Sequence, residues 1–178
     1  MASLRRVYWD AAVWIALENG EPTRVKAVES GYEAAKRGTV DIFTSTISYV
    51  EVFRLVSEQC FEKPLPQDGL DKIAEALEQD FIKLVPVDME IGRNARKLRR
   101  ELTKFEGAAD SIHLASALRW HVDEMLTYDK GHLLHLSGKI KDHNGNLLKI
   151  CEPVEPAPTP KGEADLLSYV EDGTNEKA

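Results

Sequence analysis

Four of the thirty acidic residues in this 178-residue chain occupy positions that suit metal-ion chemistry. Asp10 and Asp129 each follow a short apolar segment with the pattern of a strand, while Glu51 and Asp110 lie near the starts of segments with helical patterns. Parallel sheets gather ligands at the carboxyl ends of their strands, so we expect the four carboxylates to converge on one sheet edge. Carboxylate oxygens are the ligands that Mg²⁺ and Mn²⁺ prefer.

Each acid also has a purely structural interpretation. Asp10 would cap the helix that follows it, and Asp110 would interact favourably with the dipole at the start of its helix. Glu51 would form a capping box with Ser48, and Asp129 would begin a turn. Taken singly, these interpretations are favoured over catalysis. They do not, however, require the four acids to share one edge of a sheet.

The surroundings of Glu51 favour a chemical role. It is the only charged residue between Asp41 and Arg54, and its neighbours are Tyr49, Val50, Val52 and Phe53. A carboxylate among apolar side chains needs a partner, because burying an unpaired charge is unfavourable. A divalent cation would be a suitable partner for several acids at once.

Strand-like and helix-like segments alternate along the chain, which predicts a parallel sheet covered on both faces, a three-layer α/β/α sandwich. The expected strands are residues 7–9, 40–43, 81–85, 124–127 and 147–150. The expected helices are residues 11–18, 22–36, 45–59, 67–79, 88–105 and 109–121. We assign residues 1–151 to one domain.

Residues 152–178 differ from the rest of the chain. Four prolines fall within residues 152–160, and seven acids with two lysines give residues 152–178 a charge of −5 out of the total of −7. The composition predicts a disordered tail. Because the remaining 151 residues carry only −2, the net charge does not exclude a nucleic-acid partner.

Composition also limits the location of the protein. No apolar run approaches the ~18 residues of a membrane span. The apolar run after Arg5 and Arg6 is interrupted by Asp10 and lacks a cleavage site, so we do not expect a signal peptide. Cys60 and Cys151 are too few for a disulfide framework or a zinc site, which favours a reducing cytoplasm.

Over most of residues 5–151 the chain resembles the PIN-domain ribonucleases, especially the VapC-type toxins of toxin–antitoxin pairs. Four blocks carry the resemblance in order along the chain, and each contains one of the four acids: residues 7–15, 45–52, 109–117 and 126–129. The block at residues 109–117 is the most specific. The last block has a Thr-x-Asp pattern, from Thr127 to Asp129.

The resemblance implies a metal-dependent endoribonuclease that acts on single-stranded or looped RNA. It implies that Mg²⁺ or Mn²⁺ is held by four residues: Asp10, Glu51, Asp110 and Asp129. We expect the Thr127 hydroxyl to support one of these ligands. A toxin of this family also implies an antitoxin partner, and homodimers are common among its members.

The chain departs from the family pattern at Ala11, where a Ser or Thr is usual. A missing hydroxyl beside the first acid would weaken the orientation of that acid. One alternative is therefore a catalytically silent PIN module that binds RNA or protein. Another is a metal-dependent phosphatase, against which the lack of a second Asp after Asp10 argues.

Other candidate residues lie outside the four blocks. In the helix at residues 88–105, the side chains expected to contact RNA phosphates are Arg93, Arg96, Lys97 and Arg100, although a solvated face is an equal alternative. We expect His132 and His135 to be loop residues without a third ligand nearby, and His113 to be a packed helix residue. The three tryptophans, Trp9, Trp14 and Trp120, are expected in the core or an interface.

Overall fold

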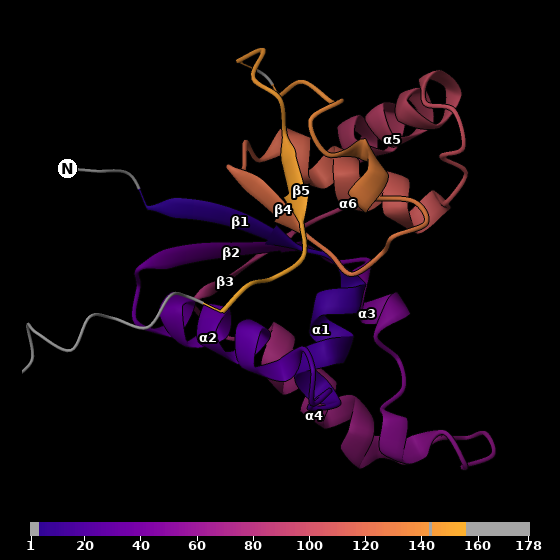
Figure 1. Cartoon of the computed structure of the whole chain (residues 1–178). Coiled ribbons are helices and arrows are strands. Elements are labelled where there is room, and N and C mark those ends of the chain that lie inside the picture. The colour runs from indigo at the N-terminus through magenta and orange to yellow at the C-terminus, as the bar shows by residue number, and fades with distance from the viewer. Residues whose placement is uncertain (1–3, 143, 156–178) are drawn as a thin grey trace, which may run out of the picture.

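The computed structural model describes residues 4–142 and 144–155, and its centre is one parallel sheet with the strand order β3-β2-β1-β4-β5 (Figure 1). The five strands are β1 Arg5–Trp9, β2 Val40–Ser45, β3 Ile82–Val85, β4 Glu124–Leu126 and β5 Lys149–Cys151. Tyr8 in the central strand lies opposite Phe43 of β2 and Met125 of β4. All four strand pairs are parallel, as the alternation of segments predicts.

Helices cover both faces of the sheet, which confirms the three-layer sandwich. Figure 1 shows α5 and α6 on one side and α1, α2 and α4 on the other. The helices are α1 Ala11–Glu18, α2 Val25–Lys36, α3 Ser48–Glu51, α4 Gln67–Leu77, α5 Met89–Glu101 and α6 Ala108–Arg119. Two single turns of 3-10 helix, Val56–Glu58 and Leu134–Leu136, complete the described elements.

The two sides of the sheet pack into two separate hydrophobic clusters. Successive side chains of a strand point to opposite faces. Tyr8 therefore joins the cluster beneath α5 and α6, while Val7 and Trp9 join the cluster beneath α1, α2 and α4. Both faces of β1 are buried, so this strand holds the residue that follows it, Asp10, in a fixed place.

The expected helix at residues 45–59 is wrong. Only two single turns form there, α3 and the 3-10 turn Val56–Glu58, because side chains bind the backbone after α3 and hold it out of a continuous helix. The backbone N–H of Val56 donates to the side-chain oxygen of Asn19 at 2.7 Å. The buried Glu58 carboxylate accepts from the backbone N–H of Leu55 at 2.8 Å. Neither contact leaves a trace in the hydrophobic periodicity of the segment.

The other elements match their expected positions, with ends shifted by a few residues. The largest shift is in α5, which ends at Glu101 where the sequence predicted a helix to residue 105. Trp9 and Trp14 are buried as expected, and Trp120 is 38% exposed beside Phe43. Among the described residues, no helix is both long and apolar enough to cross a bilayer.

Most of the predicted tail falls outside the described residues. Of residues 152–178, the structure describes residues 152–155, which continue from the end of β5. The division of the chain at residue 151 therefore stays a prediction.

Candidate metal centre at the carboxyl edge of the sheet

Asp10 lies between the end of β1 and the start of α1. Its Oδ1 accepts the backbone N–H of Val13 at 3.2 Å and so caps α1, which confirms the structural interpretation of this residue. Its Oδ2 accepts the hydroxyl of Thr127. With 4% of its surface exposed, Asp10 is a buried acid at the sheet edge, and Thr127 lies where the sequence predicted a supporting hydroxyl.

Burial has a large effect on the acidity of Asp10. It raises the pKa of this carboxyl from 3.8 to about 6, although nearby His113 and the hydrogen bond from Thr127 lower it. The carboxylate form therefore lacks full compensation from the protein. A cation bound at the sheet edge would supply the missing positive charge.

Glu51, at the end of α3, contacts a histidine of α6. Its Oε2 lies 2.6 Å from Nε2 of the buried His113, whose Nδ1 lies 2.8 Å from the hydroxyl of Tyr8. Burial raises the pKa of Tyr8 well above its usual value, so its hydroxyl stays protonated and shares a hydrogen bond with Nδ1. An ionised carboxylate only accepts, so Nε2 of His113 donates to Glu51. The partner that the sequence required for Glu51 is thus a histidine within the protein.

Two expectations around these residues need correction. The capping box of Ser48 and Glu51 is wrong, because Ile47 precedes α3 as its N-cap and makes no side-chain capping bond. The neighbours of Glu51 are also more exposed than expected, with Val50 at 73% and Phe53 at 53%. His113 is packed in its helix as expected, but it also belongs to the polar site.

Asp110 lies in the first turn of α6, which begins over the same edge of the sheet. Burial and the neighbouring Asp129 raise its pKa. Gly107, the N-cap of α6, leaves the space that this carboxylate occupies, because a Cβ at residue 107 would collide with Oδ2 of Asp110. A glycine is therefore required for the observed position of Asp110.

Asp129 forms the turn that the sequence predicted. Its Oδ1 accepts the backbone N–H groups of Gly131 at 2.7 Å and His132 at 3.0 Å. The backbone N–H of Asp129 donates to Oγ1 of Thr127 at 2.9 Å. Since the same hydroxyl donates to Asp10, Thr127 connects two of the four acids.

His132 is not the isolated loop histidine that the sequence predicted. Its Nδ1 lies 3.3 Å from Oδ2 of Asp129 and 3.4 Å from Oδ2 of Asp110. The three residues form a group of potential metal ligands whose donor atoms lie within 4.8 Å of one another. His135 is outside this group.

All four predicted acids line one open pocket at the sheet edge, together with Ala11, Ala12, Ile15 and His113. The chain brings them there from β1, α3, α6 and the segment after β4. Four carboxylates with few compensating charges form a donor set suited to a hard divalent cation. The structure thus supports the predicted convergence, and the roles of the four residues as ligands stay a prediction.

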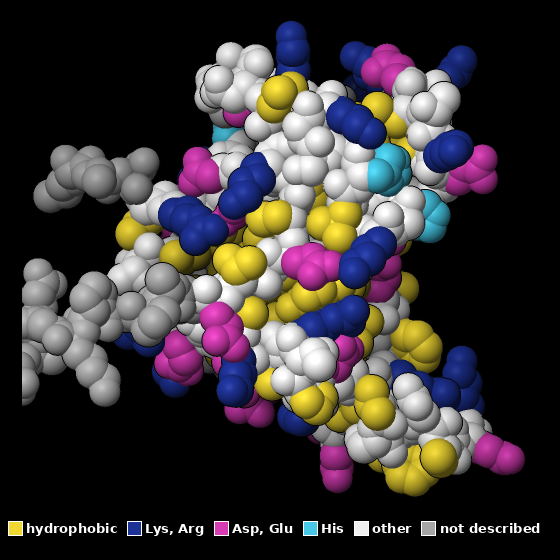
Figure 2. Space-filling model, in the orientation of Figure 1, with side chains coloured by type: hydrophobic (Ala, Val, Ile, Leu, Met, Phe, Trp, Pro, Cys, Tyr) yellow, Lys and Arg dark blue, Asp and Glu magenta, His cyan; other side chains and the backbone are white. Residues whose placement is uncertain are grey.

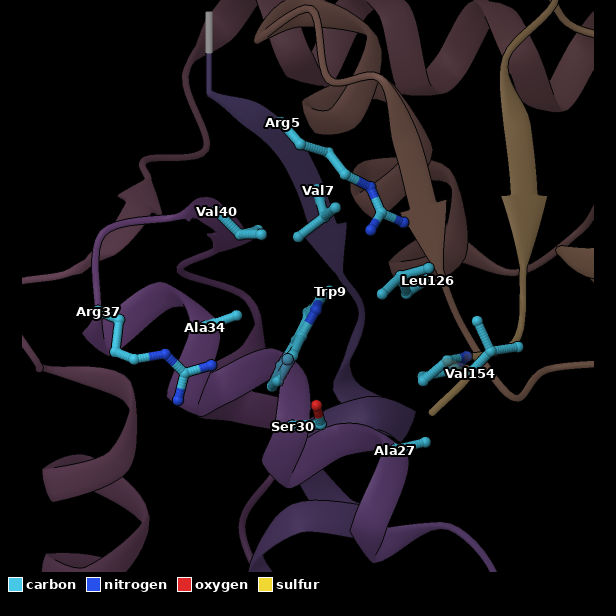
Figure 3. Close-up of a pocket in the computed structure, with 12 residues that line it drawn as sticks. Arg5, Val7, Trp9, Ala27, Ser30, Ala34, Arg37, Val40, Leu126 and Val154 are labelled. Atoms are coloured by element: carbon cyan, nitrogen blue, oxygen red, sulfur yellow. The ribbon is translucent and has the colours of Figure 1, made fainter. Parts of the chain in front are cut away.

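Another pocket lies away from these acids, between α2 and the sheet (Figure 3). Figure 3 shows Val7 and Trp9 of β1 facing Ala34 and Ser30 of α2 across it. Its lining is mainly apolar and includes none of the four acids. The polar pocket at the carboxyl edge is therefore the better candidate for phosphodiester chemistry.

The basic residues of α5 form a separate exposed group. Arg93, Arg96, Lys97 and Arg100 line one shallow pocket with Glu101, and in the described part of the chain none of them lines the pocket of the acids. Figure 2 shows dark-blue side chains at the upper right, where α5 lies, with magenta side chains among them. The acids near this group balance part of its charge, as in the pair of Lys97 and Glu101.

Sequence analysis missed two residues of the site, His113 and His132. Both are three residues after one of the predicted ligands, Asp110 and Asp129. On a helix this spacing places two side chains on the same face, and here it brings a histidine to the acids from α6. The repeated Asp-x-x-His spacing was the signal that could have found them.

Comparisons with known proteins agree with this architecture. The family model of the PIN domain matches residues 7–137. The crystal structure of VapC20 from Mycobacterium tuberculosis, a toxin that cleaves the sarcin–ricin loop, superposes with a TM-score of 0.54 at 15% identity, over 70% of this chain and 90% of that one. A toxin–antitoxin complex from Klebsiella pneumoniae gives a TM-score of 0.50 at 19% identity, over 70% of this chain and 88% of that one. No curated protein matches the chain significantly.

Proposed function

The chain belongs to the PIN-domain family, and from this premise we propose that it is a metal-dependent endoribonuclease that hydrolyses RNA phosphodiester bonds. The observation that carries the proposal is the convergence of Asp10, Glu51, Asp110 and Asp129 on one pocket from four separate parts of the chain. Helix capping accounts locally for Asp10 and turn formation for Asp129, but neither explains why all four acids line the same pocket.

The residues present fit a divalent cation. The donors are hard carboxylate oxygens, and burial raises the pKa values of both Asp10 and Asp110. Mg²⁺ or Mn²⁺ would be held by the four acids. When bound, the ion would lower the pKa of a water molecule and neutralise the charge that develops on the phosphodiester.

Protein hydrogen bonds hold three of the acids in place. Thr127 contacts both Asp10 and the backbone of Asp129. His113 donates to Glu51 and is itself fixed by Tyr8. These contacts orient the carboxylates before any ion binds, which reduces the reorganisation that binding requires. The hydroxyl of Thr127 donates a hydrogen bond to Asp10, so this acid has a supporting hydroxyl although residue 11 is an alanine.

The RNA substrate would approach the acids along α5. This helix packs against α6, whose first turn carries Asp110, and its outer face exposes Arg93, Arg96, Lys97 and Arg100. Positive side chains bind phosphates without regard to base sequence. We therefore assign them to positioning the RNA backbone.

A toxin of a toxin–antitoxin pair is the cellular role that we propose for this nuclease, acting in the cytoplasm under the control of an antitoxin protein. The segment around α3 supports a protein partner, because it exposes four large apolar side chains: Val50, Phe53, Val56 and Phe61. Exposed apolar residues that lie close together mark interaction surfaces. A homodimer contact is the other use of such a surface.

The direct test of the enzymatic proposal is RNA cleavage by the purified chain. Cleavage should require Mg²⁺ or Mn²⁺ and stop when a chelator is added. Asp110→Asn and Asp129→Asn should each lower the rate by ~100-fold or more, as losses of groups that stabilise a transition state do. Full activity in either variant, or in the presence of chelator, would overturn the proposal.

A further inference from the structure

The turn at residues 129–132 directs two potential donor atoms towards the same place. The backbone N–H groups of Gly131 and His132 both bond to Oδ1 of Asp129, which leaves its Oδ2 without a backbone donor among the described residues. Nδ1 of His132 lies 3.3 Å from that Oδ2. The turn thus presents a carboxylate oxygen and an imidazole nitrogen side by side.

A third donor atom comes from α6. Oδ2 of Asp110 lies 3.4 Å from Nδ1 of His132, and Gly107 leaves the space for it. In an octahedral site with bonds of about 2.1 Å, adjacent ligand atoms are about 3 Å apart. The distances from Nδ1 to the two oxygens are close to this spacing. All three atoms lie within 4.8 Å of one another, which is close enough for them to bind one ion.

We propose that His132 is a nitrogen ligand of the divalent ion, and that it makes this centre prefer transition-metal ions to Mg²⁺. The inference rests on the proposed function and adds a ligand to its four acids. Mg²⁺ prefers oxygen ligands, whereas an imidazole nitrogen favours ions later in the first transition series. A centre that includes His132 should bind Mn²⁺ and Co²⁺ more tightly than one made of carboxylates alone.

The alternative is that His132 is a positive counter-charge to the two acids and not a ligand of the ion. Half exposed between two acids, a protonated His132 would form weak surface ion pairs with them. A bound cation would then compete with the imidazolium. Removing the ring would leave the affinity for every divalent ion unchanged, or raise it by the same factor for all of them.

The first experiment is pulsed electron paramagnetic resonance of the full chain loaded with Mn²⁺. The wild type should show magnetic coupling between Mn²⁺ and an imidazole nitrogen. His132→Asn should lose this coupling, while the matched control His135→Asn should keep it. A wild-type spectrum without nitrogen coupling overturns the proposal, as does coupling that persists in His132→Asn.

The second experiment is calorimetric titration of wild type and His132→Asn with Mg²⁺, Mn²⁺ and Co²⁺. The affinity should fall by about twofold for Mg²⁺ and about tenfold for Mn²⁺, and more for Co²⁺, in the order of increasing preference for nitrogen. Equal factors for the three ions, or tighter binding by the variant, would contradict ligation by His132.

A third variant separates failure of this inference from failure of the proposed function. If Mn²⁺ binds the wild type and Asp129→Asn weakens it, but His132→Asn does not, the carboxylate centre stands and the nitrogen ligand is wrong. If Mn²⁺ does not bind the wild type, or if Asp129→Asn binds it equally well, the metal centre itself is wrong and both proposals fail.

Discussion

Nε2 of His113 lies 2.6 Å from Oε2 of Glu51, and the same ring contacts the hydroxyl of Tyr8 through Nδ1. A buried tyrosine under the sheet edge therefore fixes a histidine, and the histidine fixes a carboxylate that is partly open to solvent. This chain of contacts orients Glu51 from the interior of the protein.

Loss of His113 should lower activity through Glu51. We expect His113→Asn to reduce kcat by about tenfold to a hundredfold, because Glu51 loses the donor that orients it. Tyr8→Phe should have a smaller effect in the same direction, since the ring of His113 stays in place. Single-turnover cleavage at saturating RNA measures both. Unchanged kcat in His113→Asn, with the variant folded, would mean that Glu51 needs no support from α6.

The position of Asp110 depends on Gly107. Gly107→Ala should displace the carboxylate, because the added Cβ would occupy the place of Oδ2. The carboxylate is the end of a flexible side chain, so we expect stability to change by less than ~1 kcal/mol while Mn²⁺ affinity falls about tenfold. Calorimetric titration and thermal melting with chelator measure the two effects.

A matched control for this substitution lies in α5. A Cβ added at Gly92 would meet only open space, so Gly92→Ala should leave metal affinity unchanged and raise helix stability by up to about 1 kcal/mol. Equal metal affinity in wild type and Gly107→Ala would show that the position of Asp110 is not important for the ion.

The burial of Asp10 predicts how metal-free stability depends on pH. Its pKa is raised from 3.8 to about 6, so the folded protein binds a proton there that the unfolded chain has already released between those pH values. Its contribution to stability is therefore fully present below pH ~3.8 and is lost as pH rises through about 6. Asp10→Asn keeps a capping side chain and does not titrate.

Urea unfolding with chelator measures this difference. Between pH 4 and pH 7 the wild type should lose on the order of 3 kcal/mol of unfolding free energy relative to Asp10→Asn. A difference between the two proteins that stays constant over this pH range would mean that the carboxyl of Asp10 is not desolvated.

The basic face of α5 predicts a salt-dependent contribution to RNA binding. Replacing Arg96 and Arg100 together with Gln should weaken RNA binding and lower the slope of log affinity against log salt concentration by about 1–2, because each phosphate contact releases counterions. Metal affinity should not change. Arg37→Gln, just after the end of α2, is the control for loss of a positive charge elsewhere. Equal salt slopes in wild type and the double variant would favour the solvated-face alternative.

The sheet and the four acids were predictable because their signals are local. The apolar segments before Asp10 and Asp129 each have the pattern of a strand. Because strands alternate with helices along the chain, the strands are parallel and their carboxyl ends meet at one edge of the sheet. The end of the helix after residue 51 was not predictable, since it depends on Asn19 and Glu58 contacting backbone groups. His132 left only a weak signal in the sequence, its Asp-x-x-His spacing from Asp129, because it is the folded turn that brings its ring between two acids.

The most direct test of the metal centre compares thermal melts of wild type and Asp110→Asn, each with chelator and with millimolar Mn²⁺. If the four acids share one site, their repulsion destabilises the metal-free protein, and Asp110→Asn should melt higher with chelator, by roughly 1 kcal/mol of stability. With Mn²⁺ the order should reverse, because the wild type gains more free energy from binding. If Asp110 only stabilises the first turn of α6, Asp110→Asn should not melt higher than the wild type with chelator. The difference in melting temperature between the two proteins should then be the same under both conditions. Such parallel melts would contradict the shared metal centre.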